Sequence, residues 1–183
     1  MKKKLLIAAL ILLLVPVVIY FSFPGILYNY SITSAIKAAG LSKKIAVDNY
    51  FIHYLEGGQG ETILLLHGFG ADKDSWPRFT ESLTENYHVV AVVLPGFGEN
   101  SKKETDSYSI ADQVKRVNRI VETLELKKFH IGGNSMGGAI SGKYTVEYPD
   151  KVLSLALLNT AGIYSAKKVN LWSLWKKGTT LFW

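Results

Sequence analysis

The apolar residues of this chain begin with a run from Leu5 to Phe23 that no charged residue interrupts and that follows the basic start Met1-Lys2-Lys3-Lys4. At about 1.5 Å per residue, a helix of this length crosses a hydrocarbon layer of about 30 Å. A cleaved signal peptide usually has an apolar region of only about 7–15 residues, followed by a small-x-small site, and Phe21-Ser22-Phe23-Pro24 is not such a site. The pattern therefore predicts an uncleaved, single-pass membrane anchor over residues 1–30.

The basic start also predicts the orientation of this anchor. Lysines that flank a membrane span stay on the cytoplasmic side, so we expect a cytoplasmic N-terminus and the rest of the chain on the opposite, extracytoplasmic side. A secreted protein released by signal cleavage is the alternative. A buried core helix is disfavoured because such helices are rarely hydrophobic on every side.

After the anchor the hydrophobic pattern changes twice. Residues 31–48 contain an amphipathic stretch, Ser31 to Lys44, and are predicted to form a linker. Over residues 49–165, short apolar runs alternate with helical periodicity, which is typical of a βαβ succession. The expected strands are Tyr50–Leu55, Thr62–Leu66, His88–Leu94, Phe129–Ile131 and Val152–Leu158, and the expected helices are Ser75–Glu85, Ser109–Leu126 and Met136–Tyr148. The fold class predicted is α/β, with a mostly parallel sheet and flanking helices.

Composition and charge narrow the possible functions. The chain is 48% hydrophobic and only 20% charged, which is too apolar for a disordered tail. It has no cysteine, which excludes disulfides, thiolate metal sites and a cysteine nucleophile. The net charge of +6 comes from lysines in residues 1–40 and 166–183, two segments without acidic residues, whereas the part between them is slightly acidic. A nucleic-acid groove is therefore not expected there.

The most informative motif is Gly133-Asn134-Ser135-Met136-Gly137, which follows one expected strand and precedes an expected helix. This is the G-x-S-x-G pattern of a nucleophile elbow, in which a serine lies in a sharp, strained turn between two glycines. The backbone N–H of Met136 would then point to the place where an oxyanion develops. A plain glycine-rich turn or a phosphate-binding loop is the alternative, but no G-x-G-x-x-G or Walker lysine is present. No cofactor or metal is expected.

Two further turns follow expected strands. In His67-Gly68-Phe69-Gly70, the N–H of Phe69 is the candidate for a second oxyanion donor, and His67 is interpreted as a structural histidine. Leu94-Pro95-Gly96-Phe97-Gly98, taken alone, is an ordinary loop signal.

Together, the three turns resemble those of the α/β-hydrolase family over about Tyr50 to Ile163, and the anchor with Gln113-Val114-Lys115-Arg116 and Gly133 to Gly138 resembles membrane-anchored monoacylglycerol lipases and bacterial lipases. The resemblance implies a serine esterase or lipase that forms an acyl-enzyme and acts on lipid esters such as monoacylglycerols. It implies Ser135 as nucleophile, with the Phe69 and Met136 amides as the oxyanion hole and Gly68, Gly70, Gly133 and Gly137 as motif glycines. Val93 departs from the acidic residue usual before the Pro-Gly turn. Relatives with an aspartate nucleophile are disfavoured.

The partners that a serine nucleophile needs do not follow in this chain. In this family's order an acid and then a histidine come after the serine, but all four histidines precede Ser135, and only Glu147 and Asp150 are acidic beyond it. We therefore expect the N-terminal portion of a hydrolase, inactive by itself, with a sheet that stops after Val152–Leu158. Residues 166–183, rich in Trp and Lys, are expected to start a cap over the acyl site. The alternatives are a non-catalytic membrane-anchored binding module and a different hydrolase of this fold, an amidase or a C–C bond hydrolase.

Overall fold

The computed structural model describes residues 2–47, 51–100, 106–162 and 180–182. The chain divides into two compact units, Met1–Ala35 and Ile36–Trp183.

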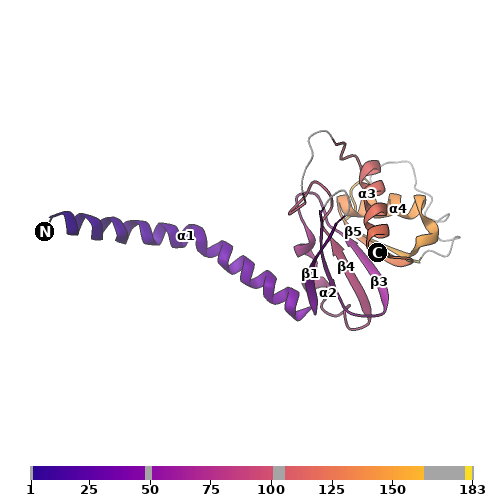
Figure 1. Ribbon diagram of the computed structural model, residues 1–183, viewed down its shortest axis with the longest axis horizontal. Helices are drawn as coiled ribbons and strands as arrows, with labels where there is room; N and C mark the ends of the chain where they lie inside the picture. Colours follow the sequence, from indigo (N-terminus) through magenta and orange to yellow (C-terminus); the bar gives the residue numbers. More distant parts are fainter. Residues whose placement is uncertain (1, 48–50, 101–105, 163–179, 183) are drawn as a thin grey trace. The chain divides into compact units, whose positions relative to one another are not determined.

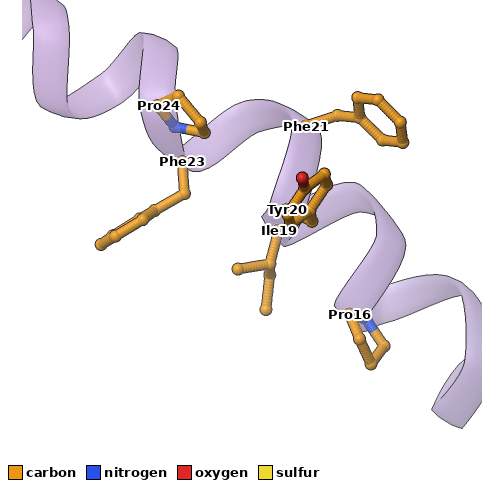
Figure 2. Close-up of a pocket in the computed structure, with 6 residues that line it drawn as sticks. All are labelled: Pro16, Ile19, Tyr20, Phe21, Phe23 and Pro24. Atoms are coloured by element: carbon orange, nitrogen blue, oxygen red, sulfur yellow. The ribbon is translucent and has the colours of Figure 1, made fainter.

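The first unit consists of most of helix α1, Lys2–Ala38, which contains Pro16 and Pro24 (Figure 1). A proline removes one backbone hydrogen bond and crowds the preceding turn, so two prolines account for the bends of this helix. Figure 2 shows Phe21 on the opposite side of the helix from Ile19 and Phe23. Within the span Leu10–Ala38, the apolar 18-residue window has a mean hydropathy of 2.5 and none of that window is buried. The helix is long and apolar enough to cross a membrane, by length and composition, and a signal sequence would meet the same criterion.

The second unit contains a seven-stranded sheet in the order β1-β2-β4-β3-β5-β6-β7. Strands β1, β2 and β4 pair antiparallel, and all other pairs are parallel. The strands are β1 Leu41–Val47, β2 Phe51–Gly57, β3 Glu61–Leu66, β4 Tyr87–Val92, β5 Phe129–Asn134, β6 Val152–Leu158 and β7 Thr180–Phe182. This is the mostly parallel sheet that the sequence predicts.

The helical elements of this unit are η1 Lys73–Ser75, α2 Pro77–Thr80, α3 Ile110–Thr123, α4 Met136–Glu147 and η2 Pro149–Lys151. Helix α3 begins where its apolar stripe predicts, because Ser109 caps it by accepting a hydrogen bond from the Asp112 N–H. Its buried Val114, Val117 and Val121 join the side chains of β3 and β4 in one core, and α4 packs on β5, β6 and α3 (Figure 1). Each such buried side chain contributes about 1.5–3 kcal/mol.

Two expected elements differ from the structure at the start of the sheet. Residues 31–48, predicted as a linker, contain the end of α1 and all of β1, which pairs with β2 along its whole length. Exposed Lys43 and Lys44 hide this edge strand from a hydrophobicity pattern, and such charges are how edge strands avoid pairing with other chains. The sequence predicts a single helix over Ser75–Glu85, but the helix α2 found there spans only Pro77–Thr80. The residues after Thr80 form turns.

The far edge of the sheet also differs from expectation. The sheet does not stop at β6, because β7 pairs with it in parallel over three residues. Three residues are too short for any period, so this strand has no sequence signal. We expected the far edge of β6 to be unpaired, and this expectation is wrong, because β7 pairs with it. Most of residues 166–183, where a cap was predicted to start, lies outside the described residues.

Candidate active site

Ser135 occupies the sharp turn between β5 and α4, where the motif places it. Its φ of 51° and ψ of −114° put a non-glycine residue in a sparsely populated region of backbone space. Its N–H donates to the Leu158 carbonyl at 2.9 Å, and its own carbonyl accepts from the Ala161 N–H at 3.0 Å. The end of β6 and the loop after it therefore hold the strained turn on both sides of the serine.

The glycines on either side of Ser135 allow three elements to come together. A Cβ added at Gly133 would lie 2.2 Å from the Gly137 carbonyl oxygen, and one added at Gly137 would lie 2.2 Å from the Leu66 carbonyl oxygen. Any side chain at either position would push α4 away from β5 or β3. The physical reason for G-x-S-x-G is thus present in this fold.

The turn after β3 lies against this elbow. A Cβ at Gly68 would meet the Ser135 Cβ at 3.4 Å, so the His67-Gly68-Phe69-Gly70 turn faces the serine as the sequence predicts. The Phe69 ring is 80% exposed and lies edge-on to Phe97, with 5.5 Å between ring centroids. Met136 is the first residue of α4, so its N–H has no carbonyl of the helix to bind. The two amides that the sequence selects therefore belong to turns that meet at Ser135.

His67 has a structural position. It is fully buried, its Nδ1 lies 2.7 Å from the Gly68 carbonyl oxygen, and its Nε2 accepts from the Leu94 N–H at 2.9 Å. Nδ1 must then carry the only ring proton. Burial lowers the pKa of His67, and the Gly68 carbonyl and the charge of Asp72 offset only part of this effect. A ring with both nitrogens engaged is not available as a base, as the structural interpretation predicts.

The other three histidines pair with carboxylates, and two of them, His88 and His130, do so at the ends of their strands that lie far from the serine. His88 and His130 are second residues of β4 and β5, where they contact Glu56 at 2.9 Å and Glu61 at 3.2 Å. At about 3.3 Å per residue, a strand separates His130 from Ser135 by roughly 16 Å. His53 lies 3.6 Å from Glu99. Within the described residues, no hydrogen bond joins the Ser135 hydroxyl to a histidine.

The stability of the fold should depend on pH through His67. Because its folded-state pKa is lowered from 6.5, its contribution is fully present above pH 6.5 and is lost as the pH falls through the folded-state value. We expect the free energy of unfolding, measured with urea between about pH 5.5 and 7.5, to fall more steeply toward acid in the natural chain than in His67→Gln. Equal slopes would show that His67 is not held neutral.

One contributor to this site has a weak sequence signal. The segment Leu158 to Ala161 holds the backbone of Ser135 at both ends, although its residues carry no catalytic group in any motif. Only Gly162, after an apolar strand, marks a turn at this position.

A serine at positive φ, between a strand of a mostly parallel sheet and the helix that follows, defines an α/β protein with a nucleophile elbow. A family model described as alpha/beta hydrolase fold matches residues 61–178. The chain belongs to the alpha/beta hydrolase fold family.

Three individual proteins illustrate what this chain is similar to. Lipase 3 of Moraxella sp. (strain TA144) is 44% identical over 108 residues, which are 58% of this chain and 34% of the lipase. Monoacylglycerol lipase ABHD6 of Bos taurus is 42% identical over 120 residues, which are 63% of this chain and 36% of the relative. The crystal structure of a membrane phospholipase A, a bacterial virulence factor, is 42% identical with a TM-score of 0.74 and covers 97% of this chain and 58% of that one. The chain thus spans about a third of the length of these curated relatives.

Proposed function

We propose that Ser135 is the nucleophile of a serine hydrolase that cleaves carboxylic esters, with lipid esters such as monoacylglycerols as substrates. The observation that supports this proposal best is the strained backbone of Ser135 in a turn that faces Gly68. Backbone strain of this kind costs about 1–3 kcal/mol and persists where the surrounding structure holds it, most often at active sites. The lipase names of the relatives support the class of substrate.

In the proposed reaction, the Ser135 Oγ attacks the ester carbonyl carbon and its proton passes to a base. The carbonyl oxygen becomes an oxyanion, which the Phe69 and Met136 N–H groups stabilise until the alcohol leaves and an acyl-enzyme remains. Water then attacks the acyl group, the acid is released and the serine regains its proton. The chemistry needs neither a metal nor an organic cofactor.

The base for this reaction is not supplied by the histidines of this chain. His67 is engaged through both nitrogens, and His88 and His130 lie at the amino ends of β4 and β5, opposite to the end that carries Ser135. His53 lies 3.6 Å from Glu99 and, within the described residues, has no hydrogen bond to the Ser135 hydroxyl. We therefore propose that these 183 residues carry the nucleophile and the oxyanion donors but not the acid and histidine of the triad. For the chain by itself, a membrane-anchored binding module is the second candidate, favoured by this missing base.

A fusion protein provides the test of substrate class. It continues this chain after Gly162 with the segment of the Moraxella lipase that follows that lipase's counterpart of Gly162. We expect it to release fatty acid from monoacylglycerols and to hydrolyse p-nitrophenyl esters, with Ser135→Ala as the control. Hydrolysis of the matching amides or C–C substrates in preference to esters would contradict the ester assignment.

We propose that α1 stays attached as a membrane anchor, with residues 1–30 in the membrane and the hydrolase unit on the extracytoplasmic side. The span Leu10–Ala38 has the hydropathy of a membrane helix. Membranes of expressing cells should retain the full-length chain after a carbonate wash, and protease added outside spheroplasts should cleave it. A mature N-terminus between residues 25 and 40 would show signal cleavage instead.

A further inference from the structure

Lys73 is a buried lysine close to the candidate active site. It lies in the loop after β3, in the turn η1, and is only 2% exposed. Lysine is among the residues least often buried unless it is paired. Its Nζ donates to the Glu99 Oε2 in the loop after β4, and it lies 3.6 Å from the Asp74 Oδ1. The ammonium thus joins two loops that are 26 positions apart in the sequence.

This ion pair is the second link between the same two loops. The first is His67, whose Nε2 accepts from the Leu94 N–H at 2.9 Å. The loop after β4 is itself tied to β2, because the Asn100 side chain donates to the Val93 carbonyl and accepts from the His53 N–H. The segment from residue 67 to residue 73 is therefore held at both ends by the loop after β4, which is itself hydrogen-bonded to β2.

The middle of that segment has little packing of its own. Phe69 is 80% exposed, with the edge contact to Phe97 as its packing partner, and Gly70 has a φ of 71° with no atom within 4 Å of an added Cβ. One turn hydrogen bond, from the Ala71 N–H to the Gly68 carbonyl at 3.2 Å, spans it. The orientation of the Phe69 N–H must then depend largely on how the two ends of the segment are fixed.

We propose that Lys73, through its ion pair with Glu99, is a positioning residue that fixes the Phe69 N–H toward Ser135. The inference rests on the proposed function, in which that N–H stabilises the oxyanion. A donor helps only if it is oriented before the reaction, because reorienting it during the reaction would cost part of the stabilisation it gives.

The electrostatics of the surrounding groups keep this pair ionised at neutral pH. Burial acts to lower the pKa of Lys73, but the hydrogen bond with Glu99 and the charges of Asp74, Glu99 and Asp72 together raise it. The hydrogen bond from Lys73 lowers the pKa of Glu99, and the charges of His53 and Lys43 act in the same direction. Neutralising Glu99 removes the carboxylate that is hydrogen-bonded to the buried ammonium and leaves it only the charges of Asp74, 3.6 Å away, and Asp72, a situation that proteins relieve by local opening.

Hydrogen–deuterium exchange of the full 183-residue chain in detergent micelles tests the proposal without turnover. We expect Glu99→Gln and Lys73→Met to speed exchange of the hydrogen-bonded amides of this loop, Ala71, Asp74 and Ser75, by about tenfold or more, with β5 and α4 unchanged. Glu147→Gln is the matched control, since it removes an ion pair with Lys143 on the surface of α4. Lys73→Arg, which keeps the charge, should restore slow exchange. If Lys73→Met does not fold, the half-exposed Glu99 still carries the test.

Unchanged exchange in this loop, or equally faster exchange across the whole sheet, would overturn the proposal. In the fusion protein, Glu99→Gln should lower kcat by about 10–100-fold with KM unchanged, as expected when an oxyanion donor is misplaced. A loop that loosens while kcat stays the same would also overturn it. A fusion protein without Ser135-dependent turnover would instead contradict the proposed function and leave the exchange result standing.

Discussion

Ester hydrolysis by the 183-residue chain is expected to be equally slow before and after Ser135→Ala. A serine hydroxyl stays protonated at neutral pH unless a base removes its proton, and no histidine of this chain is hydrogen-bonded to it within the described residues. Hydrolysis of p-nitrophenyl esters, measured for both chains at equal concentration, gives the comparison. Labelling by fluorophosphonates should be correspondingly weak.

The fusion protein should behave in the opposite way. With an acid and a histidine added, Ser135→Ala is expected to lower ester turnover by about 10⁴–10⁶, because members of a triad act as a unit. Strong Ser135-dependent turnover by the 183-residue chain alone would contradict this account. It would require His53, His67, His88 or His130 to act as the base from a position different from the one described here.

The second large effect concerns the fold around the serine. Gly137→Ala should lower the free energy of unfolding by more than about 3 kcal/mol, since its Cβ would lie 2.2 Å and 2.5 Å from two backbone oxygens that cannot move alone, those of Leu66 and His67. Against a usual domain stability of about 5–15 kcal/mol, that loss is large. Urea unfolding followed by tryptophan fluorescence, to which buried Trp76 contributes, measures it.

Gly142→Ala is the matched control on the same helix. An added Cβ there meets only the Leu157 Cδ2, at 4.0 Å, so the substitution should stabilise α4 by about 0.5–1 kcal/mol through helix propensity alone. Equal effects of the two substitutions would show that α4 does not approach β3 as closely as described.

The parts of the fold that sequence could predict are those with a repeating pattern or a motif. Helix α3 has both an apolar stripe and a capping serine, and the elbow has glycines at two positions where β3, β5 and α4 approach one another closely. Strand β1 has neither, because its lysines interrupt the alternation, and its place in the sheet depends on pairing with β2. Helix α2 is shorter than the helix that the sequence pattern predicts, and turns follow it after Thr80.

The candidate site shows the same limit more sharply. The sequence selects Ser135, Phe69 and Met136 as candidates because they lie in motifs with a physical reason. It does not identify Lys73 or Glu99, since a lysine in a loop is usually solvated, and only the tertiary contact of two loops buries this one. Nor does it predict that the loop after β6 holds the serine backbone. Contacts between loops that are far apart in the sequence produce no periodic pattern of residues, so a sequence pattern cannot predict them.

The central claim is that Ser135 is the nucleophile, and mapping a covalent adduct tests it most directly. The fusion protein is treated with a fluorophosphonate, digested, and the modified residue located by tandem mass spectrometry. We expect one adduct, on the Ser135 Oγ, and we expect both this adduct and ester turnover to be absent after Ser135→Ala. An adduct on another residue, or ester turnover that persists in Ser135→Ala, would contradict this claim.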